Sequence, residues 1–460
     1  MRSAASPDNL YGALDDEHRK GSRTFPSRLS FPRMKFPKFF LASALLTASA
    51  LVAADVKPDL PRIPEKTFNV RTSGAKGDGT TDDTAALQAA INTASKAGGG
   101  TIEIPAGVYL SGPLMLSSSL NLHLASGATL KMLPLDRYPG GTSRGEDFLS
   151  GADLHDVALT GAGTIDGQGE PWWPFAKTGG AKRPRMFKLN KCERVLVEGV
   201  TLKNSPMFHI AFSGMSHVTV RGVTIRAPAS TAPVPSHNTD ACDVSGRTIL
   251  VEHCDISVGD DNYTCGGDTH DVLIQHNTYG NGHGVSIGSY ARNGVSNITV
   301  RNCTFTGTDC GIRIKSDRDR GGVIENLVYE DLKMTDVNFP ILIYGTYMAK
   351  EREFRDLHKL TPEIAARYPA APLGKLTPVF KNITFRNITA TASPKHRAGL
   401  LWGLPEAPAE NILFQNVAIT ADLPFGIYNG ENIRFDHCTI TTPDGINKLS
   451  TSNAQVTVTP

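Results

Sequence analysis

Length, composition and charge exclude several classes of protein. The chain has 460 residues, 40% of them hydrophobic, and a formal net charge of +2. Such a chain can bury a large core, and a net charge near zero gives it no bias toward nucleic acid or anionic membranes. We therefore expect a soluble globular protein that acts as a monomer, with neither nucleic acid nor a membrane as partner.

The N-terminal part has the features of an export signal. From Met34, MKFPKFFLASALLTASALVAADV combines a short basic segment with an apolar segment too short to span a membrane, and small residues precede Asp55. We predict a signal peptide over 34–54 and a single mature domain over 55–460, in a secreted or periplasmic protein. Residues 1–33 are polar and Arg-rich, which indicates a start codon placed too far upstream; an unusually long n-region of the signal is the alternative.

The seven cysteines do not have the pattern of a disulfide-rich domain. Their number is odd, so at least one stays unpaired or pairs between chains. Several fall at inward positions of the repeat described below, where a free cysteine behaves as a small hydrophobic residue. The cysteines are Cys192, Cys242, Cys254, Cys265, Cys303, Cys310 and Cys438.

A short hydrophobic pattern repeats along much of the chain. The order apolar-x-apolar-x-x-apolar-x-apolar recurs, for example, as VLVEGVTL (195–202), VTVRGVTI (218–225) and ITFRNITA (383–390), and most repeats begin 21 to 31 residues apart. Short strands with this period cannot bury their apolar face alone and must stack on their neighbours. We predict an all-β chain folded as a right-handed, single-stranded parallel β-helix. A leucine-rich repeat shares the period, but its Leu-rich consensus and helical segments are missing.

A helix ahead of the repeats is expected to cap the solenoid. In GDGTTDDTAALQAAINTASKAGGG, Asp82 or Asp83 can cap the helix N-terminus, and the glycines at 98–100 can end the helix. Helix capping is therefore a sufficient explanation for this pair of adjacent aspartates. The apolar residues of the predicted helix that share one face are Leu87, Ala90, Ile91 and Ala94.

A second pair of adjacent aspartates, Asp260 and Asp261 in SVGDDNY, lies between two repeat strands and has no such reason. Asp260 lies four residues after Ile256, and His283 lies four residues after Tyr279, so the two occupy nearly the same position on successive coils. Stacked coils are about 4.8 Å apart. We therefore expect Asp260 and His283 to lie side by side.

Neighbouring coils are expected to add three charged residues to the same face. SHNTDACDVSG brings Asp240 to the preceding coil, just before the strand TILVEHCDI. On the following coil GIRIKS aligns with GVSIGS, and strand alternation turns Arg313 and Lys315 outward when Ile312 and Ile314 face inward. One face of four consecutive coils then carries three carboxylates, an imidazole and two cations.

This set of side chains suits acid–base chemistry on an anionic substrate. Crowding raises the pKa of one carboxyl group, so an acid that keeps its proton can lie beside others that are ionised. Glycoside hydrolysis needs this division, with one acid to protonate the leaving oxygen and one base to activate water. A basic pair one coil away suits a substrate that carries its own carboxylate.

The same residues carry a resemblance to a known family. NTD (238–240), GDDN (259–262), GNGHGVSIGS (280–289) and RIKS (313–316) resemble, in the same order, the four signature segments of the polygalacturonases, the family 28 glycoside hydrolases. The resemblance covers most of the mature chain and is closest to bacterial endo-acting enzymes, also in NSPMFHIAFSG (204–214). It implies a pectinase that hydrolyses α-1,4 bonds between galacturonates of homogalacturonan with inversion.

The resemblance also implies roles for the matching residues. Asp260 is expected to be the general acid, Asp240 and Asp261 to activate water, and His283 to tune the acid. Arg313 and Lys315 are expected to grip the sugar carboxylate. The other candidate substrate-binding residues are Tyr347, with Tyr344 as the weaker option, Asn238 of the NTD segment, and His209, for which a role as a buried wall residue is the alternative.

Some segments depart from the family pattern. Ala241 follows NTD where the family usually has Gly, and the insertion at 348–382 exceeds one coil. A long loop can wall off one end of a cleft, as an exo-acting enzyme requires, so the endo or exo mode stays open. We interpret Trp172 and Trp173 as packing of a loop over the solenoid rather than stacking on sugar, and 317–320 as a solvated turn.

Other functions are weaker alternatives. A calcium-dependent pectate lyase has a similar solenoid, but the histidine and the RIK pair argue against it. A non-catalytic polysaccharide-binding solenoid explains the repeats but not the clustered carboxylates. Within hydrolases, a rhamnogalacturonan-type enzyme is the nearest alternative, although such relatives tend to lack the GHG histidine and the RIK cations. Because no CxxC or HExxH spacing occurs, we predict no metal site and no cofactor.

Overall fold

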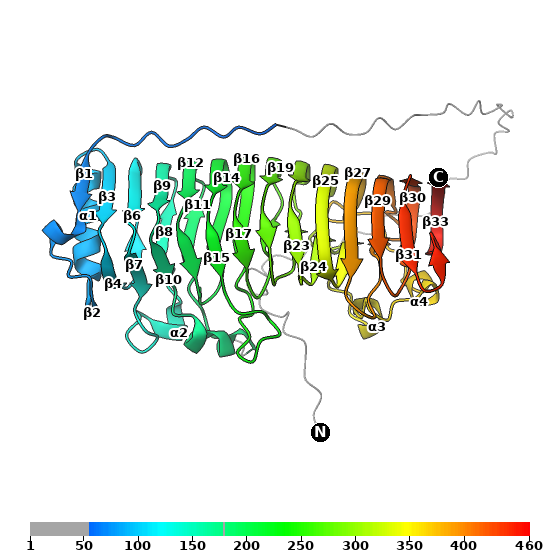
Figure 1. The fold of residues 1–460 in the computed structure, drawn as a ribbon, viewed down its shortest axis with the longest axis horizontal. Coiled ribbons are helices and arrows are strands. Elements are labelled where there is room, and N and C mark those ends of the chain that lie inside the picture. The colour runs from blue at the N-terminus through cyan, green and yellow to red at the C-terminus, as the bar shows by residue number, and fades with distance from the viewer. Residues whose placement is uncertain (1–54, 178–179) are drawn as a thin grey trace, which may run out of the picture. The chain divides into compact units, whose positions relative to one another are not determined.

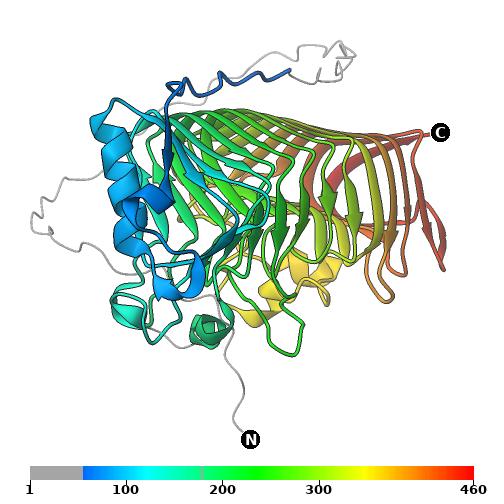
Figure 2. The same ribbon diagram turned by 60° about the vertical axis from the view of Figure 1, so that its left-hand side comes forward.

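Parallel strands stacked in coils dominate the structure. The computed structural model describes residues 55–177 and 180–460, so the predicted upstream extension and signal peptide lie outside the described residues. The strands pair in parallel from coil to coil, apart from β31 (Thr439–Thr442) and β32 (Gly445–Ile446), which pair antiparallel. Figures 1 and 2 show the chain winding through successive coils, and the predicted right-handed parallel β-helix is confirmed.

The strands belong to three stretches of the solenoid. The first coils contain β1 (Thr67–Asn69), β2 (Asp78–Asp82), β3 (Gly100–Ile104), β4 (Gly107–Ser111), β5 (Leu114–Met115), β6 (Leu120–Leu124), β7 (Ala128–Met132), β8 (Leu149–Ala152), β9 (His155–Gly161), β10 (Thr164–Asp166), β11 (Phe187–Asn190), β12 (Glu193–Glu198) and β13 (Thr201–Lys203). The middle coils contain β14 (Ile210–Arg221), β15 (Thr224–Arg226), β16 (Cys242–Glu252), β17 (Asp255–Ser257), β18 (Tyr263–Cys265), β19 (Thr269–Gln275), β20 (Thr278–Tyr279), β21 (Val285–Ile287), β22 (Val295–Arg301), β23 (Thr304–Thr306) and β24 (Cys310–Lys315). The last coils contain β25 (Val323–Val337), β26 (Phe339–Tyr344), β27 (Val379–Ala392), β28 (Leu400–Trp402), β29 (Ala409–Thr420), β30 (Phe425–Asp436), β31, β32 and β33 (Leu449–Thr459). The helices are η1 (Val70–Ser73), α1 (Thr84–Lys96), α2 (Gly141–Arg144), η2 (Glu170–Lys177), α3 (Arg352–Arg355) and α4 (Pro362–Ala366).

The core lies inside the coils because alternate residues of each strand point inward. In β24, Ile312 and Ile314 are fully buried and pair with Val285 and Ile287 of the preceding coil. The seven cysteines are buried free thiols, several of them at inward positions as expected. Apolar stacking from coil to coil therefore holds the solenoid together.

Asparagines in the left-handed backbone region turn the chain at the corners. Asn382, Asn411 and Asn432 have φ values of 54°, 56° and 51° and lie at equivalent corners of successive coils. Asn411 Nδ2 donates to Asn382 Oδ1 over 3.3 Å, and Asn432 Nδ2 donates to Asn411 Oδ1 over 2.8 Å. Asparagine tolerates this conformation better than most residues. Side-chain ladders thus reinforce the backbone pairing between coils.

Helix α1 packs at the N-terminal end of the coil stack (Figure 2), and the predicted cap of the solenoid is confirmed. Asp83 is its N-cap residue, but the Asp83 carboxylate accepts from the N–H groups of Lys76 and Gly77 instead of the helix. Asp82 Oδ1 accepts from the N–H of Thr84 over 3.0 Å. Among the described residues, no helix is long and apolar enough to cross a membrane.

One sheet of the solenoid carries the predicted site, and we call it the site sheet. Its strands pair in the order β8, β11, the start of β14, the start of β16, β18, β21, β24, β26, β28 and the start of β30. Successive coils thereby bring residues that are 20 to 60 positions apart in the sequence onto one face. Their outward side chains form columns along the coil axis.

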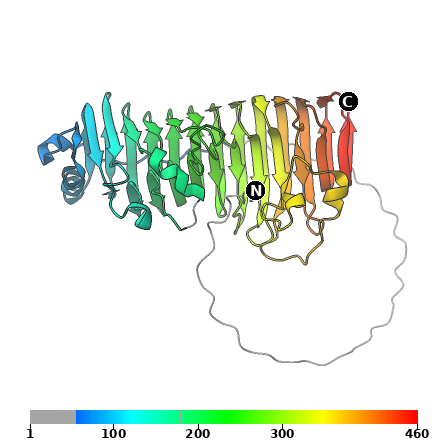
Figure 3. The same cartoon turned by 90° about the horizontal axis from the view of Figure 1, so that it is seen from below.

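The insertion covers the C-terminal end of the site sheet. In the structure it runs from 348 to 378, since β27 begins at Val379. Its Phe354 and Tyr368 lie with ring centroids 6.4 and 5.6 Å from that of Trp402, and Figures 1 and 3 show α3 and α4 beside the last coils. A second hydrophobic cluster thus forms outside the coils. The outward-facing residues of the sheet that it buries are Leu342, Tyr344, Leu400, Trp402 and Tyr428.

The turn at 317–320 is solvated only at Asp319, and its Asp317 and Arg318 anchor this insertion, which the prediction of a solvated turn did not foresee. Arg318 pairs with Glu406 through two hydrogen bonds and donates to Pro369 O over 2.7 Å. Its guanidinium also lies 4.6 Å from the ring centroid of Tyr368. The Asp317 carboxylate accepts from the N–H of Met348 over 2.6 Å.

Candidate active site

Strand alternation places two cations on the outer face of β24. Arg313 pairs with Ser286 of the preceding coil, as the alignment of GIRIKS with GVSIGS predicts. Arg313 and Lys315 are only 8% and 6% exposed, because neighbouring coils and turns surround them. Two positive charges with so little water around them require negative partners.

Asp261 supplies the negative partner. Its Oδ2 accepts from Lys315 Nζ over 3.0 Å, while its Oδ1 accepts from Ser286 Oγ over 2.8 Å and from Arg313 Nη2. Burial would raise the pKa of Asp261, but the charges of Arg313 and Lys315 outweigh burial and hold that pKa well below its usual range. Asp261 therefore keeps its negative charge to a lower pH than an ordinary aspartate does.

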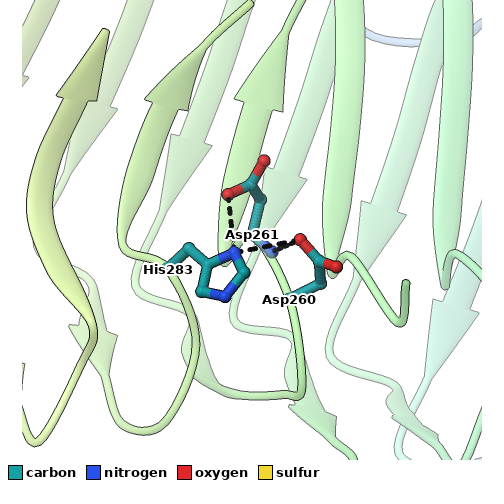
Figure 4. Close-up of side chains that lie close together, drawn as sticks. All are labelled: Asp260, Asp261 and His283. Carbon is teal, nitrogen blue, oxygen red and sulfur yellow. Dashed lines mark hydrogen bonds and ion pairs between the residues drawn. The ribbon is translucent and has the colours of Figure 1, made fainter. Parts of the chain in front are cut away.

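The turns before β18 and β21 bring Asp260 and His283 together, as predicted. The N–H of His283 donates to Asp260 O over 2.9 Å, and His283 Nδ1 lies 3.1 Å from Asp260 Oδ1. Gly282 makes this approach possible, since it has φ 135° and a Cβ there would lie 2.4 Å from Asn262 Oδ1. Figure 4 shows the carboxyl groups of Asp260 and Asp261 both approaching the same ring nitrogen, Nδ1 of His283.

The imidazole of His283 is surrounded by charges of both signs. Nδ1 lies 3.6 Å from Asp261 Oδ1 and 3.1 Å from Arg313 Nη2. Burial and the Arg313 charge lower the pKa of His283, but Asp260 and Asp261 outweigh both and raise it to about 9. The ring is therefore an imidazolium at neutral pH, and Nδ1 donates toward the carboxylates.

Asp260 is the most exposed of the three predicted catalytic carboxyl groups, with 17% of its side chain accessible. Its Oδ2 lies 3.1 Å from Asn238 N and 3.4 Å from Asn238 Nδ2, and its Oδ1 accepts from the N–H of Asp261 over 3.0 Å. Burial would raise the pKa of Asp260, but the His283 charge outweighs burial and lowers it. In the free site the proton therefore lies on His283 rather than on Asp260.

Asp240 has the opposite electrostatic character. It is 6% exposed, and its Oδ1 has no hydrogen-bond partner among the described residues. Burial, followed by the charges of Asp260 and Asp261, raises the pKa of Asp240 well above its usual range. The pKa values of the carboxyl groups on this face are thus shifted in opposite directions, upward for Asp240 and downward for Asp260 and Asp261.

His209 is a buried wall residue, which is the alternative that the sequence left open for it. Its side chain is fully buried, with Nδ1 3.3 Å from Asp240 O and Nε2 accepting from the N–H of Ser205 over 3.3 Å. Burial lowers the pKa of His209 to about 4, so the ring is neutral. The N–H of His209 donates to Asp240 O over 2.8 Å, and the residue supports the Asp240 backbone from below.

The structure also places the remaining candidates. The Tyr347 ring centroid lies 5.3 Å from Lys315 Nζ, next to the cationic pair, whereas Tyr344 is buried under the insertion. Trp172 and Trp173 are buried in η2, as expected for a packed loop; Trp172 lies against Tyr138 with centroids 5.6 Å apart. Asn238 contacts Asp260 directly rather than facing open space.

The ligand atoms of Asp260, Asp261 and His283 lie close enough together to suit a metal ion. The neighbouring charges do not suit one. Arg313 and Lys315 contact both oxygens of Asp261, so a divalent cation would have to bind beside two positive charges. The cluster therefore fits an acid–base role better than a metal site.

Two polar residues of the site were missed in the sequence. Asp243 lies on the outer face of β16 beside Thr264, and burial followed by the Asp261 charge raises its pKa to about 7. The alternation of DACDVSG could have placed it there. Arg183 donates to Asn238 Oδ1 over 2.8 Å from a loop outside the repeat pattern, so no periodic signal points to it.

Comparisons with known proteins agree with this geometry. Residues 95–361, more than half of the chain, match the model of the glycosyl hydrolases family 28. The chain is 31% identical over 418 residues to an endo-polygalacturonase of Pectobacterium carotovorum subsp. carotovorum, covering 84% of this chain and 94% of the relative. It is 32% identical over 357 residues to an exopolygalacturonase of Zea mays, covering 74% of this chain and 80% of the relative.

A solved structure shares the fold. The exopolygalacturonase from Thermotoga maritima superposes with a TM-score of 0.69 at 24% identity, over 86% of this chain and 94% of that one. The match to the family model and the relatives of more than 30% identity extend through the coils that carry the carboxyl cluster and the cationic pair. The chain is therefore a glycosidase that belongs to glycosyl hydrolase family 28.

Proposed function

We propose that the protein hydrolyses α-1,4 bonds between galacturonates in the homogalacturonan of pectin, with inversion of configuration. The observation that supports this most is the set of carboxyl groups in different protonation states beside a cationic pair on one sheet face. Hydrolysis needs a proton donor and a base, and an acidic sugar needs cations. The relatives named polygalacturonase agree with this substrate.

Asp260 acts as the general acid together with His283. Asp260 is the most exposed of these carboxyl groups, so a glycosidic oxygen reaches it most easily. The imidazolium Nδ1 of His283 lies 3.1 Å from Asp260 Oδ1. The two groups share one proton, so the pair rather than either residue titrates. When the bond breaks, the proton passes from the pair to the leaving sugar oxygen, and water supplies the new hydroxyl group.

Asp240 is the stronger base of the two remaining carboxyl groups. Its raised pKa makes its ionised form more basic than Asp261, and its Oδ1 has no partner in the described part of the chain. Asp261 instead fixes Arg313 and Lys315 in place and stays ionised. Asp240 must therefore lose its proton before it can take one from the attacking water.

Arg313, Lys315 and Tyr347 bind the sugar on the C-terminal side of the carboxyl groups. Lys315 has three N–H donors and its contact with Asp261 uses one of them, so a sugar carboxylate can be added to its partners. The Tyr347 ring lies beside the ammonium group and offers an apolar face for the sugar ring.

The insertion limits how far a polymer can extend in this direction. Beyond Lys315 and Tyr347, the outer face of the site sheet is buried under α3 and α4, while on the other side Lys188 and Ser213 remain accessible. A sugar chain that follows the column of outward residues therefore meets a wall on one side only. This favours an exo-acting mode that releases short products from one chain end.

The test uses the purified mature protein with polygalacturonate and follows reducing ends, product masses and ultraviolet absorbance. We expect reducing ends without unsaturated products, activity that survives a chelator, and loss of turnover in Asp260→Asn with the fold intact. Absence of any hydrolysis, or activity that disappears on chelation and is restored by calcium, contradicts the proposal. Mono- or disaccharide from the earliest times supports the exo mode, and a random ladder of fragments contradicts it.

A further inference from the structure

Arg183 joins two separate turns next to the carboxyl cluster, one at Pro206 and one at His237 and Asn238. Its side chain is 8% exposed, and Nη1 donates to Pro206 O over 3.0 Å and to His237 O over 2.8 Å. Nη2 donates to Asn238 Oδ1 over 2.8 Å. A guanidinium that binds two carbonyl groups and one amide fixes these turns with respect to each other.

These hydrogen bonds determine which way the Asn238 amide points. A guanidinium has only donors, so the amide atom that faces Arg183 must be the acceptor Oδ1. The other amide atom, Nδ2, then faces Asp260 and lies 3.4 Å from its Oδ2. The backbone favours the same arrangement, since Asn238 has φ 57° and its own N–H lies 3.1 Å from Asp260 Oδ2.

Asp260 Oδ2 is therefore presented with two N–H groups of one residue. If the amide turned over, Asn238 Oδ1 would face Asp260 Oδ2, and two acceptors would be brought together. Such an arrangement is tolerated only when Asp260 carries a proton on that oxygen. The orientation imposed by Arg183 thus favours the carboxylate form and leaves Oδ1 as the oxygen that meets His283.

We propose that Arg183 is a positioning residue for the reaction: through the Asn238 amide it holds the Asp260 carboxyl so that Oδ1 exchanges a proton with His283. This inference rests on the proposed function, because it assumes that Asp260 donates the proton. Arg183 acts on the acid through this amide, so its replacement should change the behaviour of Asp260 while the acid itself stays in place.

The expected effect on pH dependence has a definite sign. The charged and titratable groups that act on Asp260 are His283, Asp261 and Lys315, together with Asp240 and His237. Replacing Arg183 leaves these groups in place, but Arg183→Gln also removes a positive charge that lowers the pKa of His237; Arg183→Lys keeps that charge. Without the imposed amide orientation Asp260 is easier to protonate, so the alkaline limb of kcat/KM moves to higher pH, by about half a unit to one unit for one hydrogen bond.

The experiment compares pH profiles of wild type, Arg183→Gln and Arg183→Lys on polygalacturonate. Glutamine can donate or accept, so it no longer dictates the amide orientation, whereas lysine keeps a donor-only cation. We expect the upward shift and a fall in kcat for Arg183→Gln, with partial return of both in Arg183→Lys. Arg221→Gln is the matched control, because Arg221 pairs with Glu198 of β12 away from the site sheet; its profile should match wild type.

A second variant covers the case in which Arg183→Gln does not fold. Asn238→Gly accepts the positive φ and removes only the side-chain amide, so it should show the same upward shift. If wild type is active and the alkaline limb is unchanged in every variant that folds, the inference is overturned. The proposed function is not affected by that result. Wild type without any hydrolysis overturns the proposed function itself.

Discussion

His283 Nδ1 lies 3.1 Å from Asp260 Oδ1, and the backbone N–H of the same histidine donates to Asp260 O over 2.9 Å. Two interactions between successive coils thus fix the imidazole against the carboxyl group. Since the pKa of His283 is raised to about 9 and that of Asp260 is lowered, the pair keeps one proton across neutral pH. That proton is the one the leaving sugar oxygen needs.

Replacing His283 by Gln should show how much the reaction depends on the proton that His283 shares with Asp260. The amide can still donate to Asp260, but it carries no transferable proton, so Asp260 alone must hold the acid proton. We expect kcat/KM to fall by about a hundredfold or more and the alkaline limb, near pH 9 in wild type, to move to lower pH. The measurement is the pH profile of kcat/KM, and an alkaline limb that stays in place contradicts the shared proton.

Asp240 should set the acid limb of the same profile. It works as a base only when ionised, so the rate rises with pH as Asp240 loses its proton, at a pH above that of an ordinary aspartate because its pKa is raised. Asp240→Asn should abolish turnover. Asp243→Asn is the control, since Asp243 is a nearby carboxyl group with a pKa of about 7; disappearance of the acid limb in that variant would assign the limb to Asp243 instead.

Lys315→Met tests whether the substrate is anionic. The variant removes one cation from the sugar site and one partner from Asp261. Removing a charge-assisted hydrogen bond to the sugar should cost about tenfold to a hundredfold in kcat/KM on polygalacturonate, and less on methyl-esterified pectin, which lacks that charge. Lys203→Met, whose lysine pairs with Asp166, is the control. Equal decreases on both substrates would mean that Lys315 acts only through Asp261.

Arg318→Ala tests whether the insertion limits the products. Arg318 ties the insertion to the solenoid through Glu406, Pro369 and Tyr368, so its removal should loosen the wall and lower the melting temperature. We expect longer products to appear among the first fragments. Arg367→Ala is the control, because the Arg367 pair with Glu353 is exposed and lies within the insertion. If wild type, Arg318→Ala and Arg367→Ala all give the same products, the insertion does not limit product length.

The periodic part of the structure could be predicted from the sequence because period and side-chain direction are linked in a parallel β-helix. Once Ile312 and Ile314 face inward, Arg313 and Lys315 must face outward, and the coil spacing brings residues about two dozen positions apart into contact. The proximity of Asp260 to His283 follows from that rule alone. The capping helix was predictable for the same reason, from its apolar face.

The irregular segments could not be predicted in this way. Arg183 and the 348–378 insertion lie outside the repeat, so no register relates them to the site. His209 lies within a matching segment, but its burial depends on how the turn folds beneath Asp240. The pKa shifts of the carboxyl groups could not be predicted either. The lowered pKa of Asp260 and the raised pKa of Asp240 depend on distances and burial rather than on sequence spacing.

The most direct test of the central claim is the anomeric form of the first product, followed by proton NMR during cleavage of an α-1,4-linked oligogalacturonate. An inverting reaction, with Asp260 and His283 as acid and Asp240 as base, predicts that the β-anomer of the new reducing end appears first and then equilibrates, and that Asp260→Asn gives no product. An α-anomer formed first would contradict the assigned roles, and an unsaturated product would contradict hydrolysis itself.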